Sequence, residues 1–318
     1  MKADILSSLT LTQLRYLVAV ADKRSFVAAA EACFVTQPTL SMQLHKLEEE
    51  LEVRLFDRSR QPVVPTEAGE LIIEQARKVI MEAEKIGQLL RESKGQVSGL
   101  LKLGVIPTIA PYLLPLFVTS FLEQYPLVRL EIIELTTAEL MDRLRKGQLD
   151  AAILATPLDD ASLHEQPLFY ESFAAYVSKK HTLTQKKQLV PADIHLEDVW
   201  ILNEGHCFRN QVLNLCKTKT AKEESRLNYE SGSIETLKRM VEQGNGITIL
   251  PELALAGFSA KQTSLIRYFK DPEPVREISL VTHRTQVKQK LMEALSEAVI
   301  NAVPERMTVK GRRKVLAI

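Results

Sequence analysis

Two cysteines, Cys207 and Cys216, lie nine positions apart in the segment 203–217 and could do redox chemistry. If residues 209–217 form a helix, nine residues span about 13 Å. The Cα atoms of a disulfide lie only about 4.4 to 6.8 Å apart. Helix and disulfide can therefore both exist in one protein only if the segment refolds between them, which would make the pair a conformational switch.

The neighbours of Cys207 suit a reactive thiol. His206 precedes it and Arg209 follows two residues later, and cationic neighbours lower the pKa of a thiol and favour the thiolate. Cys216 follows a more apolar run, Leu213-Asn214-Leu215, and suits a resolving role. On spacing alone, the alternative is that both are ordinary buried cysteines, which behave as small hydrophobic residues.

Composition indicates a soluble protein of several domains. The 318 residues, 45% apolar and 25% charged, exceed one ordinary core and predict two or three domains. No run approaches the roughly 18 apolar residues of a membrane helix, and the first residues do not resemble a secretory signal. We therefore expect a cytoplasmic protein that has no membrane partner.

Three cysteines in such a chain favour a transient, regulatory disulfide over a structural framework. The sequence has no CxxC motif or clustered Cys/His pattern of the kind that binds structural zinc. We expect no cofactor and no metal.

The first 65 residues predict three short helices followed by a wing. Apolar positions 14, 17, 18 and 21 mark the first helix, Ser25 caps the second, and Thr36-Gln37-Pro38 begin the third. This is a helix-turn-helix arrangement, in which the second helix of the motif reads base edges in the major groove. Residues 54–65 predict a wing with a basic tip that could contact phosphates.

The candidate DNA contacts are polar or exposed residues of the third helix and one arginine of the wing. They are Thr36, Gln37, Pro38, Thr39, Ser41, Met42, Lys46 and Arg58. The alternative is a small helical bundle with no DNA role, because residues 1–65 carry eight Lys and Arg against eight Asp and Glu and DNA binding usually needs net positive charge.

Residues 66–94 predict one long helix that begins after the cap Thr66. Its apolar residues follow heptad spacing at Ile72, Ala76, Val79, Ala83, Ile86 and Leu90. A solitary helix has little of its own chain to cover such a seam, so we expect two chains to dimerise here. Packing against its own wing and first helix is the alternative, which could account for Ala68 and Leu71. Residues 94–99, with two glycines, predict a hinge.

Residues 12–90 resemble the winged helix-turn-helix and linker helix of LysR-type transcription regulators. The resemblance rests on the pattern AxxxxFxxAAxxxxVTQPTLSxQLxxLExEL, followed by LFxR and TEAG. It implies that this part of the chain binds promoter DNA.

The remainder of the chain predicts an α/β fold. Strands near 100–105, 128–135 and 151–154 alternate with helices near 112–123 and 138–146, and this alternation predicts a parallel sheet. The pattern recurs after residue 160, with strands near 174–177, 200–202, 227–230 and 246–250 and helices near 209–215, 234–243 and 288–302. Two such halves predict a bilobed, periplasmic-binding-protein-like (Rossmann-like) sensor domain over 95–304. In the basic tail 305–318, residues 309–314 are expected to be a solvated end, with nonspecific DNA contact as the alternative.

Three motifs in this domain resemble the peroxide-sensing OxyR branch of the LysR-type regulators. They are residues 106–115 (IPTIAPYLLP), residues 204–207 (EGHC) with Arg209 and Cys216, and residues 246–251 (GITILP). The resemblance implies that hydrogen peroxide oxidises Cys207, the peroxidatic thiolate, to a sulfenic acid, which condenses with the resolving Cys216.

The same resemblance places Thr108, Thr137 and His206 near Cys207, where they help to bind peroxide or tune the thiol, and gives Arg209 the role of stabilising the thiolate. From the residues themselves, Thr108 could equally be a turn or cap hydroxyl, and Thr137 the N-cap of the following helix. Cys33, at the end of the second helix, is expected to be structural.

Two positions depart from the peroxide-sensing pattern. Asn210 stands where many such sensors carry Asp, and residues 227–229, around Asn228, lack a histidine often found there. Both departures concern groups that could transfer protons during oxidation.

Together these observations predict a transcription activator switched by peroxide, and not an enzyme. Its expected partners are promoter DNA, RNA polymerase, a glutaredoxin- or thioredoxin-type reductant and further copies of itself, in a dimer through the linker helix and a tetramer. One alternative keeps the fold but senses a small metabolite in the interlobe cleft. Another is a thiol peroxidase, because Cys207 would reduce peroxide in each switching event.

Overall fold

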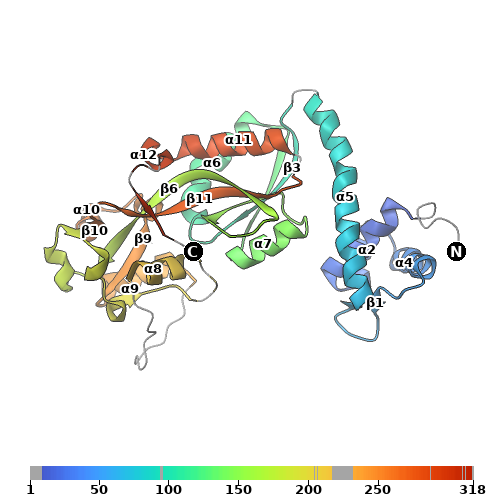
Figure 1. The fold of residues 1–318 in the computed structure, drawn as a ribbon, viewed down its shortest axis with the longest axis horizontal. Helices are drawn as coiled ribbons and strands as arrows, with labels where there is room; N and C mark the ends of the chain where they lie inside the picture. Colours follow the sequence, from blue (N-terminus) through green and yellow to red (C-terminus); the bar gives the residue numbers. More distant parts are fainter. Residues whose placement is uncertain are drawn as a thin grey trace. The chain divides into compact units, whose positions relative to one another are not determined.

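The structure is a computed structural model that describes residues 9–93, 96–203, 205, 207–216, 232–286, 288–309, 311 and 313–316. The chain forms two compact units, Met1–Gly95 and Gln96–Ile318, which are described separately (Figure 1). His206, Asn228 and the strand predicted near 227–230 lie outside the described residues.

The first unit is a winged helix-turn-helix followed by a long helix. Its elements are α2 (Leu11–Lys23), α3 (Phe26–Ala32), α4 (Gln37–Leu51), the antiparallel pair β1 (Phe56–Asp57) and β2 (Val64–Pro65), and α5 (Glu67–Ser93). The hydroxyls of Ser25 and Thr36 accept hydrogen bonds from backbone N–H groups three residues later, which satisfies donors that helix starts leave unpaired. The three helices predicted in this region are confirmed.

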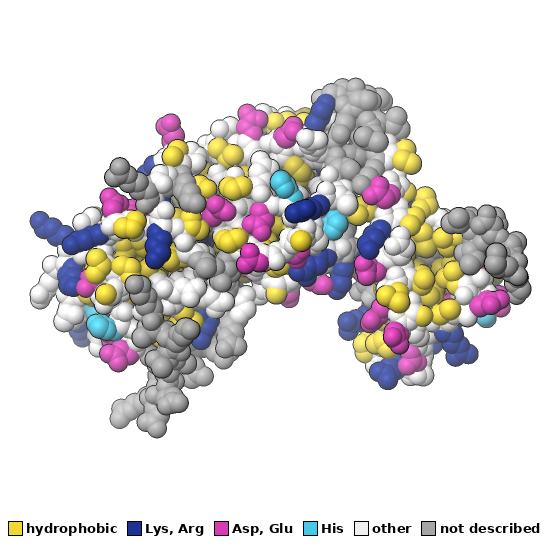
Figure 2. All heavy atoms as spheres, in the orientation of Figure 1, with side chains coloured by type: hydrophobic (Ala, Val, Ile, Leu, Met, Phe, Trp, Pro, Cys, Tyr) yellow, Lys and Arg dark blue, Asp and Glu magenta, His cyan; other side chains and the backbone are white. Residues whose placement is uncertain are grey.

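The apolar seam of α5 is divided between burial and exposure. Ile73 and Ala76 are buried in the core of the first unit, where Ile72 and Val79 also pack, because α2 lies against α5. Leu71 is 67% exposed and Ile86 66% exposed. The suggestion that the unit's own core accounts for Leu71 is therefore wrong, whereas that core does cover the first part of the predicted seam. Figure 2 shows hydrophobic side chains exposed among charged ones on this unit.

The second unit contains a ten-stranded sheet within the described residues. The main path runs β4-β3-β5-β11-β6-β10-β7, while β12 pairs with β11 and β9 joins β6 to β8. β3 (Gly99–Val105), β4 (Val128–Glu134) and β5 (Ala151–Thr156) are parallel, and α6 (Ala110–Gln124), α7 (Thr137–Arg145) and α11 (Gln289–Ala302) belong to the same lobe.

Two long strands connect this first lobe with the second. β6 (Leu163–Val177) pairs through its first part with β11 (Pro274–His283) and through its last part with β9 (Ile247–Pro251) and β10 (Ile266–Phe269). All three pairings are antiparallel. β6 runs out of the first lobe and β11 returns to it. The predicted α/β fold is confirmed, and so is the parallel pairing predicted for the strands near 100–105, 128–135 and 151–154. The antiparallel pairings of β6 and β11 were not predicted.

The second lobe is completed by short elements around its own apolar core. The helices are α8 (Cys207–Cys216), α9 (Ile234–Gln243) and α10 (Ala260–Thr263), with 3-10 turns η1 (Thr182–Gln185), η2 (Pro191–Asp193), η3 (Leu196–Asp198) and η4 (Glu252–Leu255), and strands β7 (Gln188–Leu189) and β8 (Val199–Trp200). The cores of the two lobes form separate clusters of buried side chains.

The described part of the tail after Pro304 is anchored to the sensor unit on both sides of the basic stretch 309–314, in which Val309, Gly311 and Lys314 are exposed as predicted for a solvated segment. α12 (Glu305–Thr308) buries Met307 in the core of the first lobe, and Leu316 is buried in the core of the second. Between them β12 (Lys314–Val315) pairs in parallel with the start of β11. The apolar side chains of Met307 and Leu316, which flank the basic stretch, hold the tail in place, because burying them removes apolar surface from water.

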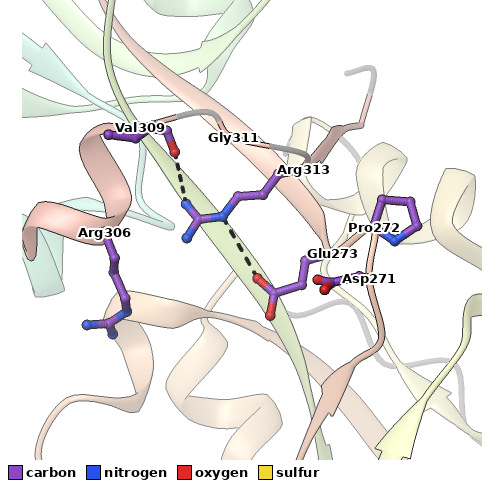
Figure 3. A pocket seen from close by; sticks show the side chains of 7 residues that line it. All are labelled: Asp271, Pro272, Glu273, Arg306, Val309, Gly311 and Arg313. Atoms are coloured by element: carbon purple, nitrogen blue, oxygen red, sulfur yellow. Dashed lines mark hydrogen bonds and ion pairs between the residues drawn. The ribbon is translucent and has the colours of Figure 1, made fainter.

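A cavity of about 570 Å³ lies between this tail and the turn before β11. Its lining residues are Asp271, Pro272, Glu273, Arg306, Val309, Gly311 and Arg313. Figure 3 shows Arg313 between the Glu273 carboxylate and the Val309 carbonyl, at 3.9 and 3.4 Å, and Arg306 pairs with Glu252. The cations of this cavity are thus already engaged by groups of the chain.

Candidate redox site

Helix α8 begins at Cys207 and ends at Cys216, so the two thiols stand at opposite ends of one helix. They are 6% and 8% exposed and are not joined in a disulfide. Cys207 belongs to the core of the first lobe, whereas Cys216 belongs to the core of the second. Nine helical steps separate them by about 13 Å along the axis, so the helix keeps the two sulfurs apart.

Thr137, the first residue of α7, presents its hydroxyl to Cys207. Thr136 caps this helix instead, because its N–H and hydroxyl both donate to Glu139 Oε2, at 3.0 and 2.7 Å, so the alternative of Thr137 as the N-cap is wrong. The buried Thr137 Oγ1 has no well-formed hydrogen bond within the described parts of the chain. It nevertheless lies close enough to the Cys207 thiol to lower the pKa of that group.

A buried ion pair, Arg276 with Glu171, lies near enough to the thiol for its arginine to lower the pKa of Cys207. The two residues face each other directly in the β11–β6 register, and both side chains are 0% exposed. Arg276 Nε and Nη2 lie 2.8 and 2.7 Å from Glu171 Oε2, and Glu171 Oε1 accepts from the Leu253 N–H at 2.8 Å. The arginine also lies over the ring of Phe208, the residue after Cys207, with 5.1 Å from Cζ to the ring centroid.

Thr108 connects the start of α6 to this ion pair. Its Oγ1 accepts from Arg276 Nη1 at 2.9 Å, and its carbonyl accepts from Nη2 at 3.2 Å. Ile109 occupies the N-cap of α6, so the Thr108 hydroxyl is not the cap that was considered as an alternative. Because the oxygen accepts from Arg276, the hydroxyl proton remains for donation to another acceptor.

Burial raises the pKa of the Cys207 thiol, and the Thr137 hydroxyl and the Arg276 guanidinium act in the opposite direction. We expected cations next to Cys207 in sequence to lower this pKa. His206 lies outside the described residues, and Arg209 donates to the Leu202 carbonyl at 3.0 Å. Among the described residues, the cation that lowers the pKa of the Cys207 thiol is Arg276, and the role given to Arg209 stays a prediction. Burial also raises the pKa of Cys216, to about 11.

Arg276 and Glu171 were missed by the sequence reasoning. Glu171 is the single charged residue in LFYESFAAYV, and Arg276 stands beside Glu277 in the otherwise mostly apolar strand PVREISLVTH. A charge in a strand whose neighbours are buried needs a partner, because desolvating an isolated charge is costly. This signal could have identified both residues, although not their pairing.

The predicted DNA-binding residues form an exposed surface of the first unit. Gln37, Pro38, Thr39, Met42 and Lys46 are exposed on α4, as is Thr36, while Ser41 is half-buried. The Thr36 hydroxyl is engaged in capping the helix, with Thr39 Oγ1 at 2.8 Å. Arg58 of the wing pairs with Glu48 at 2.8 Å and lies over the ring of Phe26.

Cys33 is half-buried against the core of the first unit, and burial raises the pKa of its thiol. In the described part of the chain, no group of three or more His, Cys, Asp or Glu residues could hold a metal ion. Nor does any helix of that part have the length and apolar character needed to cross a membrane.

Comparison with known proteins extends over nearly the whole chain. Residues 11–70 match the family described as bacterial regulatory helix-turn-helix protein, lysR family, and residues 94–304 match the LysR substrate binding domain. The hydrogen peroxide-inducible genes activator of Haemophilus influenzae is 35% identical over 93% of this chain and 97% of its own length. The DNA-binding transcriptional dual regulator OxyR of Escherichia coli is 35% identical over 92% of this chain and 95% of its own.

Solved structures of OxyR proteins are also similar to this chain. A full-length OxyR variant from Pseudomonas aeruginosa is 36% identical and covers 92% of this chain and 97% of its own, with a TM-score of 0.77. The reduced OxyR of Porphyromonas gingivalis is 33% identical and covers 68% of this chain and 100% of its own, with a TM-score of 0.61.

Proposed function

The chain belongs to the LysR family of DNA-binding transcription regulators, in its OxyR branch, and we propose that a reversible Cys207–Cys216 disulfide formed by hydrogen peroxide switches its activity. The observation that carries the proposal is the convergence of the Cys207 thiol, the Thr137 hydroxyl and the Arg276–Thr108 pair at one buried point. These groups come from three elements and the turn before α6; the Thr137 hydroxyl and the Arg276 guanidinium favour the thiolate against the effect of burial, and the two hydroxyls can donate hydrogen bonds.

In the first step the Cys207 thiolate attacks one oxygen of hydrogen peroxide. The sulfur–oxygen bond forms as the oxygen–oxygen bond breaks, which leaves a sulfenic acid and releases hydroxide that takes up a proton to become water. Arg276 offsets the negative charge of the sulfur and of the departing oxygen. The hydroxyls of Thr108 and Thr137 can donate to the peroxide oxygens, and we retain His206 as a further group near the thiol.

In the second step the Cys216 sulfur attacks the Cys207 sulfenic acid, so that the disulfide forms and water leaves. The sulfurs can meet only if α8 unwinds, because a disulfide needs its Cα atoms about 4.4 to 6.8 Å apart. Val212 and Leu215, which are buried in the second lobe, must then find new contacts. A glutaredoxin- or thioredoxin-type dithiol returns the pair to the reduced state.

The refolding requirement favours sensing over turnover. Each oxidation of Cys207 would be followed by loss and recovery of a helix that buries six side chains, which suits a switch better than a peroxidase. A metabolite sensor of the same fold would have no need for two thiols at the ends of one helix.

In the cell we place the protein in the cytoplasm, where it acts as an activator with RNA polymerase. Its functional units are the DNA-binding domain (1–65), the linker helix (66–94) and the sensor domain (95–304). Ile86, exposed on α5, supports pairing of two linker helices. We propose that two such dimers form a tetramer, so that a change in one sensor domain reaches the recognition helices on DNA.

Oxidation is expected to change the footprint on promoter DNA and not merely the affinity. Repacking of residues 207–216 alters how sensor domains associate, and paired linker helices carry that change to the spacing of the recognition helices. A genomic fragment that binds the reduced protein is first selected. The measurement is footprinting of this fragment with the reduced and with the oxidised protein. Cys216→Ser with peroxide is the control that is oxidised without a bridge. Identical protected base pairs in the two states would show that the switch does not reach the DNA-binding domain.

Gln37→Ala is expected to weaken binding to the selected fragment by about 1 to 3 kcal/mol, because an amide that hydrogen-bonds a base edge is worth roughly that much. Arg58→Ala is the comparison: if it contacts phosphate, affinity falls about equally for all sequences and the salt dependence becomes shallower. Titration of specific and unrelated duplexes at several salt concentrations measures both. Equal loss on both duplexes for Gln37→Ala would remove this residue from base recognition.

A further inference from the structure

Gln211 lies in the middle of the switch helix, one turn after Cys207 on the same side of α8. Its side chain is 0% exposed, and neither Oε1 nor Nε2 has a hydrogen-bond partner in the described parts of the chain. Rotating the amide so that Oε1 and Nε2 exchange places would create no hydrogen bond, because neither position has a partner among the described residues. The helix on which the proposed disulfide depends thus carries a buried amide that forms no hydrogen bond with the described residues.

Gln13 is a second buried glutamine of this chain, and its side-chain oxygen is hydrogen-bonded. Gln13 of α2 is 1% exposed, and its Oε1 accepts from the Thr10 N–H and from the Thr10 hydroxyl, each at 2.9 Å. That amide oxygen completes a capping box and stabilises its helix. Gln211 is equally buried in α8, but its amide forms no such hydrogen bonds with the described residues.

Unsatisfied polar atoms gather around the redox site. The described residues contain eight buried side-chain atoms without a hydrogen-bond partner, of which two belong to Gln211, one to Asn203 just before α8, and one to Thr137 beside the thiol. A buried polar group that has lost its water contacts raises the free energy of the folded state. In the reduced protein the cost of the two Gln211 atoms falls on α8, the segment that must refold.

We propose that Gln211 is a positioning residue for the resolving step: its unsatisfied amide destabilises α8 in the reduced protein and thereby favours the unwound segment in which Cys216 reaches Cys207. The inference rests on the proposed disulfide switch and deepens it. When α8 unwinds, the amide regains hydrogen bonds to water or to backbone groups. Gln211 takes no part in the chemistry, in which the sulfenic acid and the Cys216 thiol form the disulfide and release water.

An apolar side chain of similar shape removes the free-energy cost of the unpaired amide without changing the helix propensity. Met and Gln are unbranched and rank close together as helix formers, so Gln211→Met keeps the helix and deletes the unsatisfied atoms. Because the reduced form is then stabilised, the midpoint potential of the Cys207–Cys216 couple should become less negative. A tenfold shift toward the reduced form corresponds to about 30 mV.

The first test is the midpoint potential of the full-length protein in thiol–disulfide buffers, with the disulfide quantified by mass spectrometry. Gln211→Met and, as a second variant, Gln211→Leu are expected to shift it by about 30 mV toward less negative values. Gln243→Met is the matched control, because it makes the same substitution at an exposed position of α9, and it should leave the potential unchanged. An unchanged or more negative potential in both Gln211 variants overturns the proposal.

The second test separates the two chemical steps. In a Cys216→Ser background, Gln211→Met should leave the rate of sulfenic acid formation at Cys207 within about twofold of the rate with Gln211. When Cys216 is present, Gln211→Met should slow the closure of the disulfide. A fall in the sulfenic acid rate with an unchanged potential would mean that Gln211 contacts the oxidant, and would overturn the proposal.

Hydrogen exchange of the backbone amides of residues 208–216 in the reduced protein needs no disulfide at all. Exchange should be about tenfold slower in Gln211→Met than in the unsubstituted chain. Two results together would refute the proposed function: exchange is slower in Gln211→Met, but the unsubstituted protein forms no Cys207–Cys216 disulfide with peroxide. They would leave the destabilisation of α8 by Gln211 established. Equal exchange rates in a protein that does form the disulfide would refute the present inference and leave the proposed function standing.

Discussion

Replacement of Cys207 by serine is expected to abolish the response to peroxide while the protein still folds and binds DNA. Serine matches the size of cysteine but does not form an anionic nucleophile at neutral pH, so neither the sulfenic acid nor the disulfide can form. Mass spectrometry after peroxide treatment, with a trap for sulfenic acids, measures both products. A disulfide that persists in Cys207→Ser, through Cys33 for instance, would contradict the assignment of Cys207 as the attacking thiol.

Cys216→Ser is the matched control, which should accumulate the sulfenic acid without a bridge. This variant also allows the pH dependence of the first step to be measured. Because burial raises the pKa of Cys207, only a minor fraction is thiolate at neutral pH, and the thiolate is the reacting form. The oxidation rate should therefore rise with pH through and above neutrality, and a rate that is flat from pH 6 to 9 would place the thiol pKa below that range.

Loss of the Arg276 cation is expected to have the second large effect. In Arg276→Met, Glu171 is left buried without its partner, and breaking a buried ion pair in this way costs about 3 to 5 kcal/mol. The same change removes the cation that favours the Cys207 thiolate. We expect the rate of sulfenic acid formation to fall by about a hundredfold, as when a preorganised electrostatic group is deleted from a reactive site.

The double variant Arg276→Met with Glu171→Gln separates the two effects. The glutamine removes the uncompensated charge and keeps an acceptor for the Leu253 N–H, which donates to Glu171 in the structure. Urea unfolding should show most of the lost stability restored, while stopped-flow oxidation should stay slow. Recovery of the oxidation rate together with stability would mean that Arg276 acts through the fold and not on the thiol.

Local features of the sequence predicted the elements that present the site. Ser25 and Thr36 cap their helices through contacts three residues away, and the apolar spacing from Thr66 predicted α5 to Ser93. α8 runs from Cys207 to Cys216, so the conflict between this helix and a disulfide was visible from spacing alone. Such inferences succeed because caps, helical periodicity and the reach of a short segment depend on residues within a few positions of one another.

The cation beside the thiol was decided by tertiary structure. Sequence neighbours favoured Arg209, whereas the structure brings Arg276 from β11, opposite Glu171 of β6. The two paired residues are 105 positions apart, and their meeting depends on the register of two long strands that run between the lobes. The packing of Leu316 and the burial of Gln211 have the same origin. Register and burial are set by the sum of contacts along whole elements, so no local pattern could predict them.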